Sequence, residues 1–328
     1  MNNHSRTKNT IFNFIGNSLY QIIIIVLTFI TRRVFIKTLG VEYLGISGLF
    51  TNILSVLSLA DLGIGSAIYY SMYKAVAEKD EDKLAALTNY YRTMYNKIAL
   101  IVFIIGISFM PFLRYIINLE KDIPHIELYY FISILSTVFS YLFVYKTSVL
   151  YADQSEYKLK GLFIIIQLIK SIGGILIIYF TMNFIFYISF NAIMGIIGNL
   201  ICSKYAEKQY PFINKKVSLD EKEKKGIWEN IGAMFLYKFS SIILNNTDNI
   251  IISILVGTNM VGYYSNYTMI YNKIFGITDI FFNSFKSSVG NMNNNSTKEK
   301  KYQMFKVISL LSFWVFSFAC IGIFFCRR

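Results

Sequence analysis

Polar side chains recur at three- or four-residue intervals inside otherwise apolar stretches of this sequence. Between residues 10 and 36 the polar positions with this spacing are Asn13, Asn17, Tyr20, Gln21, Thr28, Thr31 and Arg32. Between residues 230 and 256 they are Lys238, Ser241, Asn245, Asp248 and Asn249. This spacing places each set on one face of an α-helix, where it can form a wall of a water-filled cavity. The chemistry expected of such a cavity is the binding of a polar substrate or a coupling ion.

Two further stretches carry similar polar faces. Residues 160–181 place Gln167, Lys170, Ser171 and Gly174 together, and residues 262–290 do the same with Ser265, Thr268, Asn272, Gly276, Asp279, Asn283 and Lys286. Asp61 lies within residues 43–73 and is followed by Gly63 and Gly65, which permit a bend there.

The apolar stretches are long enough to cross a membrane. A charged side chain inside a membrane is costly, and this cost indicates which way the side chain faces. Exposure of one such side chain to lipid costs about 2.5 to 3.5 kcal/mol, so six of them would cost on the order of 15 to 20 kcal/mol. The six are Asp61, Lys170, Lys238, Asp248, Lys273 and Asp279. We therefore expect them to face a wet cavity or one another.

Simpler roles stay open for several of these residues. Lys273 and Lys286 can extend to the headgroup layer, and Asp248 can pair with Lys238 to stabilise the fold. Arg32 and Arg33 can act as interfacial anchors at the end of the first stretch. Asp61 suits either hydrogen bonding at a helix bend or ion coupling, and Asp248 is the second candidate for ion coupling.

The elements that must position these residues are nine long apolar stretches. The chain of 328 residues is 55% hydrophobic, and its mean hydropathy is +0.47. About 20 helical residues cross a hydrocarbon core of about 30 Å. The fold class predicted is an all-α polytopic membrane helix bundle, with spans near residues 10–36, 43–73, 96–117, 126–150, 160–181, 183–203, 230–256, 262–290 and 304–326.

The basic residues predict an orientation. The net charge of +13 is compatible with nucleic-acid binding, but Lys and Arg cluster in short loops between apolar stretches, so no nucleic-acid partner is expected. With the amino terminus in the cytoplasm, 22 of the 32 Lys and Arg residues lie on the cytoplasmic side, and three, Lys170, Lys238 and Lys273, lie within spans. The positive-inside rule favours this multi-pass topology.

Several classes of site lack support in the sequence. The three cysteines, Cys202, Cys320 and Cys326, show no CxxC spacing, and the only histidines are His4 and His125. The sequence also lacks a GxxxxGK[ST] motif for ATP. We therefore expect no catalytic residues, no metal site and no cofactor, and an enzyme is not predicted.

An internal repeat links two distant parts of the chain. A shift of 217 residues places Leu19-Tyr20 on Leu236-Tyr237, Gly40 on Gly257 and Gly45 on Gly262. Six spans separate the copies, so both begin on the same membrane face, as in a parallel repeat. We expect two pseudo-symmetric lobes: a six-helix lobe at 1–206, a Lys-rich cytoplasmic linker at 207–229 and a three-helix lobe at 230–328. With three helices against six, the second lobe is incomplete, and truncation is the favoured explanation.

Two segments carry a family resemblance. Residues 33–74, with FIKTLGVEYLGISGLFTNILSVLSLADLGIGSAIYYSMYK, and residues 150–162, LYADQSEYKLKGL, resemble Wzx-type oligosaccharide flippases of the multidrug/oligosaccharidyl-lipid/polysaccharide exporter superfamily. Members of that superfamily generally have 12 to 14 helices in two lobes, so nine spans depart from the pattern.

The resemblance implies a function and a set of binding residues. It implies movement of an undecaprenyl-diphosphate-linked oligosaccharide from the inner to the outer leaflet of a bacterial plasma membrane, without ATP hydrolysis. Membrane lipid, a polysaccharide polymerase and chain-length machinery are the further partners implied. The candidate substrate-binding residues are Arg32, Lys170 and Lys238 for the diphosphate, Arg33 beside them, and Asn17, Gln21, Asn245 and Asn249 for sugar hydroxyls or phosphate oxygens. The alternative is a multidrug or cation antiporter of the same superfamily.

Overall fold

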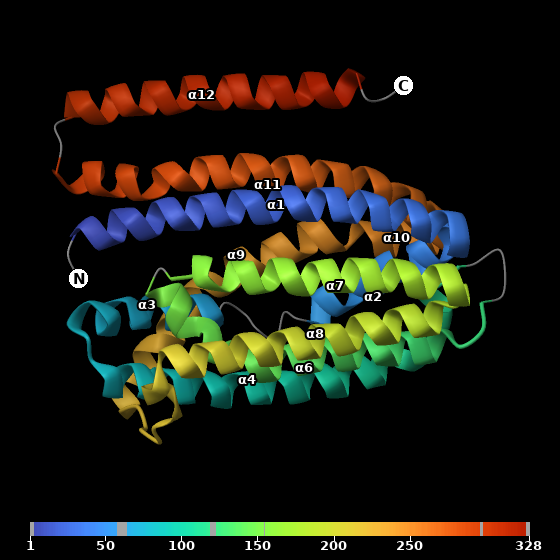
Figure 1. Cartoon of the computed structure of the whole chain (residues 1–328), viewed down its shortest axis with the longest axis horizontal. Helices are drawn as coiled ribbons and strands as arrows, with labels where there is room; N and C mark the ends of the chain where they lie inside the picture. The colour runs from blue at the N-terminus through green and yellow to red at the C-terminus, as the bar shows by residue number, and fades with distance from the viewer. Residues whose placement is uncertain (1–2, 58–63, 119–122, 154, 296–297, 326–328) are drawn as a thin grey trace.

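A computed structural model of the chain describes residues 3–57, 64–118, 123–153, 155–295 and 298–325. Every regular element in these ranges is a helix, which confirms the predicted all-α class (Figure 1). The elements are α1 (Asn3–Leu39), α2 (Val41–Leu57), α3 (Ile64–Glu78), α4 (Glu81–Phe109), η2 (Met110–Phe112), α5 (Leu113–Ile116), α6 (Ile126–Ala152), α7 (Tyr157–Thr181), α8 (Phe184–Gln209), η3 (Pro211–Asn214), α9 (Glu221–Asn246), α10 (Asp248–Leu255), α11 (Thr258–Asn295) and α12 (Lys298–Phe325).

Five helices in the described ranges are long and apolar enough to cross a membrane, judged by length and composition. They are Glu81–Ile116, Ile126–Ala152, Tyr157–Thr181, Phe184–Gln209 and Lys298–Gly322. Their outward faces are apolar, as in the series Ile165, Ile169, Ile172 and Leu176 on α7, where each side chain is about half exposed. These features fit a polytopic membrane bundle, because apolar outward faces suit lipid contact.

Two predicted spans do not form single helices. The span expected at 230–256 is interrupted at Thr247, between α9 and α10. The Thr247 hydroxyl donates to the Ile243 carbonyl, while the Thr247 carbonyl accepts from the amides of Ile250 and Ile251. A hydroxyl bonded to a preceding carbonyl competes with regular helix bonding and often bends the chain. The span expected at 43–73 covers α2 and α3, and the residues between them lie outside the described ranges.

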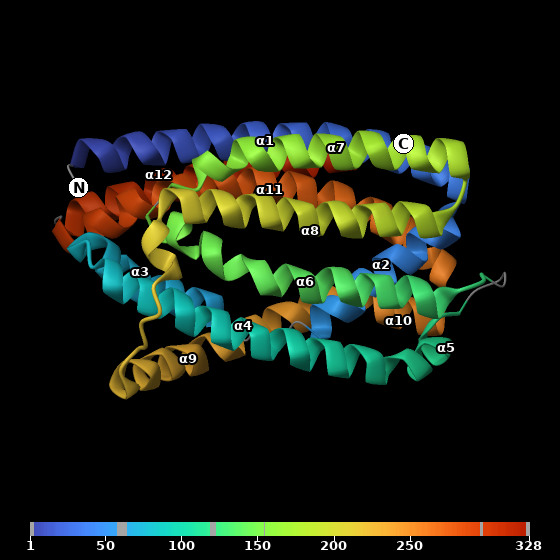
Figure 2. The ribbon, with the colours of Figure 1, turned by 60° about the horizontal axis from the view of Figure 1, so that its bottom comes forward.

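The long helices lie side by side along one direction (Figures 1 and 2). α1 packs on α7, α6 packs on both α8 and α4, and α2 packs on α11. α12 lies beside α11 at the edge of the bundle, and none of the described residues in its most apolar stretch is buried.

The two ends of the bundle differ in composition. The lysine-rich end contains the turn at Lys79 and Asp80, the turn between α6 and α7, and the connection 210–220. The glycine end contains Gly40, between α1 and α2, and Gly257, between α10 and α11. Both glycines have positive φ angles, +94° and +134°, which favour residues without a Cβ atom.

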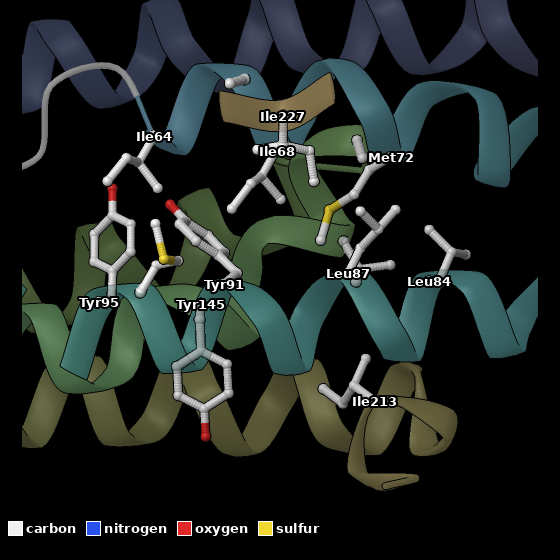
Figure 3. Close-up of a cluster of buried hydrophobic side chains, with 14 of the residues drawn as sticks. Ile64, Ile68, Met72, Leu84, Leu87, Tyr91, Tyr95, Tyr145, Ile213 and Ile227 are labelled. Atoms are coloured by element: carbon white, nitrogen blue, oxygen red, sulfur yellow. The ribbon is translucent and has the colours of Figure 1, made fainter. Parts of the chain in front are cut away.

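A buried cluster stabilises each end. At the lysine-rich end, Ile68 and Met72 of α3 contact Leu87 and Tyr91 of α4, and Ile227 of α9 completes the cluster (Figure 3). At the glycine end, α1, α2, α5, α6 and α8 contribute Phe35, Leu49, Phe50, Leu113, Tyr130, Ile134 and Phe184. Where these side chains lie within the membrane they stabilise the bundle by close packing, because lipid tails are as apolar as the side chains themselves.

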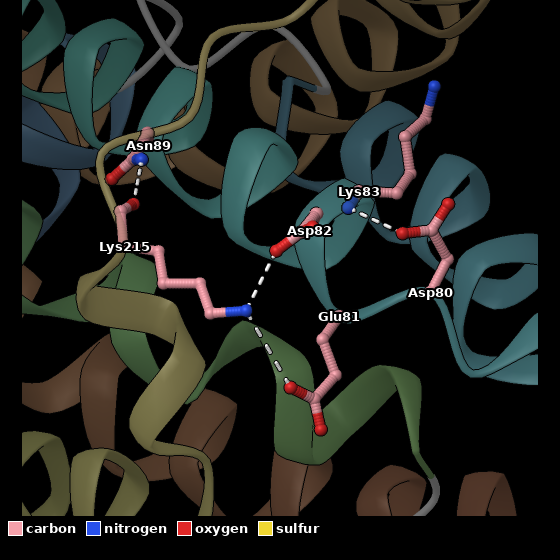
Figure 4. A network of polar contacts seen from close by, with 6 residues as sticks. All are labelled: Asp80, Glu81, Asp82, Lys83, Asn89 and Lys215. Carbon is pink, nitrogen blue, oxygen red and sulfur yellow. Dashed lines mark hydrogen bonds and ion pairs between the residues drawn. The ribbon is translucent and has the colours of Figure 1, made fainter.

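Polar contacts attach the connection 210–220 to α4 (Figure 4). Asn89 donates to the carbonyl oxygens of Lys215 and Val217 at 2.7 and 3.1 Å. The Lys215 ammonium contacts Asp82 at 2.8 Å and Glu81 at 3.9 Å. Helices reach into the predicted linker 207–229 from both sides, since α8 ends at Gln209 and α9 begins at Glu221.

Candidate substrate-binding site

Two cavities lie between helices of the bundle and share part of their lining. The first, which we call the arginine cavity, has a volume of about 250 Å³ and lies between α1, α2, α7 and α8, with Arg32 in its wall. The second, which we call the hydroxyl chamber, has a volume of about 470 Å³ and lies between α2, α6, α7 and α8. The cavities share four lining residues, Ser47, Lys170, Tyr187 and Asn191.

Arg32 connects the first helix to α11. Its Nε atom donates to the Asn266 side-chain oxygen, and its Nη2 atom donates to the Ser265 hydroxyl, both at 2.5 Å. A guanidinium has five N–H donors and no acceptor. Three N–H groups therefore remain for a ligand or water after these two hydrogen bonds.

Lys170 is the second positive charge in the arginine cavity. It lies partly buried on α7 and lines both cavities. A Cβ atom on Gly195 would lie 4.0 Å from the Lys170 Nζ atom, so the glycine leaves space beside the ammonium. Among the described residues, no ion pair within 4.0 Å includes Arg32 or Lys170.

The structure places the other predicted residues of α1 away from this pair. Arg33 is exposed and does not line either cavity. Asn17 is partly buried on α1, also outside both linings. Gln21 faces α11, because a Cβ atom on Gly276 would lie 2.7 Å from the Gln21 Nε2 atom. Of the four, only Arg32 shares a cavity with Lys170.

The predicted residues of the second half have different outcomes. Asp61 and the side chains of Lys238 and Asn245 lie outside the described residues. Asn249 is buried on α10, with no hydrogen-bond partner for its Oδ1 atom within the described structure. Asp248 is exposed and accepts a hydrogen bond from the Tyr264 hydroxyl at 2.9 Å. Asp248 is therefore not part of the arginine cavity lining.

Comparison with known proteins connects this geometry to a fold. No protein-family model matches the sequence, and no curated protein matches it significantly. A solved structure that does match is an inward-facing conformation of a multidrug resistance MATE family transporter of the MOP superfamily. The TM-score is 0.59 and the identity 16%, over 92% of this chain and 71% of that chain. This chain has the MATE transporter fold.

Within the MATE fold of this chain, the cavities also contain residues that the sequence reading did not select. Hydroxyls of α2 and α6 line the chamber at Ser47, Thr51, Ser55, Ser133, Ser136 and Thr137. Their spacing of three or four residues was a usable signal, but serine and threonine also occur on lipid-facing helices, where they bond to their own backbone. Tyr187 and Asn191 of α8 line both cavities, and Asn266 of α11, outside both linings, accepts a hydrogen bond from Arg32. All three were missed because single polar residues define no stripe.

Proposed function

We propose that this chain is a lipid-linked oligosaccharide flippase, which moves undecaprenyl-diphosphate-linked repeat units from the inner to the outer leaflet by alternating access for cell-surface polysaccharide synthesis. Its place would be the bacterial plasma membrane, with the amino terminus in the cytoplasm. The MATE transporter fold supports a transport role rather than an enzymatic one. The observation that carries the proposal is the pairing of Arg32 with Lys170 in one cavity that has no Asp or Glu among its described lining residues.

Two partly buried cations without an acidic partner favour an anionic ligand. Burial of like charges is unfavourable, and an ion of opposite charge reduces that cost. A diphosphate offers several oxygen acceptors, which match the free N–H groups of Arg32 and the ammonium of Lys170. The lipid tail would stay against the apolar outer faces of the helices.

The alternative is a multidrug or cation antiporter, since the matched structure is a multidrug resistance transporter. An organic cation would require an acidic or aromatic cavity. The described lining of the arginine cavity contains the aromatic side chains of Phe35 and Tyr187, but its charged members are Arg32 and Lys170. This charge balance favours the flippase.

A transport assay tests the proposal. In cells that depend on this chain for surface polymer, Arg32→Ala and Lys170→Ala should each reduce export by at least tenfold at unchanged protein abundance, since a hydrogen bond to a charged group contributes about 1.5 to 3 kcal/mol. Lys170→Arg should retain activity. Arg33→Ala is the matched control, because Arg33 is adjacent but exposed.

Two outcomes would contradict the flippase. One is normal polymer export by both alanine variants. The other is energy-dependent exclusion of a cationic dye by the wild-type chain that is unchanged in Lys170→Ala, which would favour the antiporter.

A further inference from the structure

The hydroxyl chamber has no role in the binding of a diphosphate by Arg32. It extends from the shared wall at Lys170 between α2, α6 and α8, and its volume of about 470 Å³ lies within the range of about 300 to 1,000 Å³ of small-molecule pockets. No Asp or Glu appears among its described lining residues. Its ligand is therefore expected to be polar but not cationic.

The hydrogen bonds inside the walls determine what the chamber offers to a ligand. Thr51 donates its hydroxyl proton to the Ser47 carbonyl at 2.8 Å. On α6, Ser133 donates to Tyr129 and Thr137 donates to Ser133, at 2.9 and 3.0 Å. Each hydroxyl has one proton and two acceptor lone pairs. These side chains have used their protons within their own helices and present acceptors to the chamber.

Asn191 of α8 also donates within its own helix. Its Nδ2 atom donates one N–H to the Tyr187 carbonyl at 2.9 Å, so its Oδ1 acceptor and its second N–H are available to the cavity. The ammonium of Lys170, at the wall shared with the arginine cavity, is the charged donor of the chamber. The chamber therefore combines many neutral acceptors with one cation at the side nearest Arg32.

A sugar fits this arrangement better than other polar groups. Its hydroxyl and amide N–H groups supply many uncharged donors, which would satisfy the acceptors of α2, α6 and α8. An organic cation would be repelled by Lys170, and an apolar group would leave the acceptor oxygens of the lining hydroxyls and of the asparagine without donors.

We infer that the hydroxyl chamber is a saccharide subsite that binds the sugar directly attached to the diphosphate, while Arg32 and Lys170 hold the phosphates. This inference rests on the proposed function, because it takes the diphosphate as the anion of the arginine cavity. It adds that selectivity for the first sugar depends on α2 and α6, rather than on the cationic residues.

A binding experiment with two lipids tests the subsite. The probes are a short polyprenyl diphosphate and the same lipid carrying one N-acetylhexosamine, titrated against the purified full-length chain in detergent. The variant is the double substitution Thr51→Val and Thr137→Val, which removes one hydroxyl from each of two walls and preserves side-chain shape. The control is Thr93→Val, since Thr93 donates to the Asn89 carbonyl at 3.0 Å on an exposed face of α4.

The expected result is a change for the sugar-bearing lipid alone. Wild-type protein should bind the glycosylated lipid more tightly than the bare diphosphate. The double variant should lose about tenfold in affinity for the glycosylated lipid, the effect of about two neutral hydrogen bonds. Its affinity for the bare diphosphate should stay within about twofold, and Thr93→Val should match wild type for both.

The remaining outcomes overturn the inference, and they separate it from the proposed function. Equal wild-type affinity for the two lipids, or an equal loss for both in the double variant, eliminates the subsite and leaves the diphosphate site intact. Unchanged binding of the glycosylated lipid by the double variant does the same. Failure of wild type to bind either lipid contradicts the flippase and the subsite together.

Discussion

The two ends of the bundle achieve close packing by different chemistry. At the glycine end, α2 and α11 cross through reciprocal contacts. A Cβ atom on Gly45 would lie 2.2 Å from the Thr258 carbonyl oxygen, and one on Gly262 would lie 2.4 Å from the Val41 carbonyl oxygen. At the lysine-rich end, partly exposed ion pairs join elements, including Lys83 with Glu223 and Lys215 with Asp82 (Figure 4).

The glycine contacts are reciprocal under the internal repeat. A shift of 217 residues converts Gly45 to Gly262 and Val41 to Thr258, so each contact is the counterpart of the other. Such reciprocity is what a two-fold axis between α2 and α11 produces. Backbone contacts at this distance are lost with a single methyl group, whereas exposed ion pairs typically contribute about 0 to 1 kcal/mol. The stability of the glycine end is therefore expected to be more sensitive to a single substitution than that of the lysine-rich end.

The largest effect is expected for Gly45→Ala. The added methyl group would meet backbone rather than a movable side chain, so it should destabilise the described conformation by about 3 kcal/mol, the upper part of the usual range for overpacking. Spin labels at the exposed positions Lys37 and Val256 should show a longer or broader distance distribution. Gly262→Ala should have an effect of similar size, because its contact is the reciprocal one.

Gly161→Ala is the matched control for this prediction. It places the same substitution in helix α7, where a Cβ atom would have nothing within 4 Å. Its distance distribution should match wild type, and its stability should be equal or up to about 1 kcal/mol higher, because alanine is the better helix former. A wild-type distribution in Gly45→Ala would show that the crossing tolerates a methyl group.

The second effect, also at the glycine end, concerns a chain of neutral hydrogen bonds. The Asn118 amide donates to the Thr258 hydroxyl at 3.0 Å, the Thr258 and Ser253 hydroxyls are 2.8 Å apart, and Ser253 donates to the Ile116 carbonyl at 2.6 Å. Thr258→Val should cost about 1 to 3 kcal/mol, because it removes the hydrogen-bond partner of the fully buried Ser253 hydroxyl and the acceptor of the Asn118 amide. Hydrogen exchange at the Asn118 amide should become faster, and Thr268→Val on the same helix should leave it unchanged.

Much of the fold was predictable because the length of each apolar stretch identifies a membrane span and the spacing of polar residues identifies a helix face. The 217-residue shift aligned Gly40 with Gly257, and the structure gives both glycines a positive φ angle between two helices. The break at Thr247 was not predicted, because the five consecutive polar residues at 245–249 also continue a plausible polar stripe. Whether the helix is interrupted here or continues with a polar face depends on one hydrogen bond, from the Thr247 hydroxyl to the Ile243 carbonyl.

The cavity residues were less predictable than the helices. The energetic cost of exposing a charge to lipid pointed to Lys170, which lines both cavities, and the polar face of α1 pointed to Arg32. Sequence could not distinguish Arg32 from Arg33, because adjacent helical residues point about 100° apart and the direction of the cavity is a tertiary property. The hydroxyl chamber was missed for a similar reason, since its walls combine α2 with the consecutive helices α6, α7 and α8, and the packing of these helices is a tertiary property.

A smaller effect is expected from the ion pair between Lys83 and Glu223, at the lysine-rich end. Both side chains are partly exposed, at 30% and 39%, so neutralising one partner with Lys83→Met should change stability by less than about 1 kcal/mol. The exchanged pair, Lys83→Glu with Glu223→Lys, should restore the wild-type melting temperature. The deficit of Lys83→Met should shrink in high salt. A loss as large as that of Gly45→Ala would contradict the contrast between the ends.

The smallest effect concerns the pH response of the connection 210–220. The hydrogen bond from Lys215 to Asp82 raises the pKa of the Lys215 ammonium, and the charges of Asp82 and Glu81 act in the same direction. A pKa that is higher in the folded chain contributes stability below the unfolded value of about 10.4, and the contribution is lost as pH rises through the folded pKa. The attachment of the connection to α4 should therefore weaken at alkaline pH and be unaffected near neutral pH.

A titration of ¹³C-dimethylated lysines measures this response directly, with the Lys215 signal assigned by its loss in Lys215→Arg. Asp82→Asn should move the Lys215 midpoint down towards the ordinary value. Glu78→Gln should not move it, because Glu78 pairs with Lys74 instead. The connection should stay in place in both variants, since Asn89 still holds the carbonyls of Lys215 and Val217. An unchanged midpoint in Asp82→Asn would mean that this contact does not persist in solution, and the lysine-rich end would then depend on Asn89 and its apolar cluster.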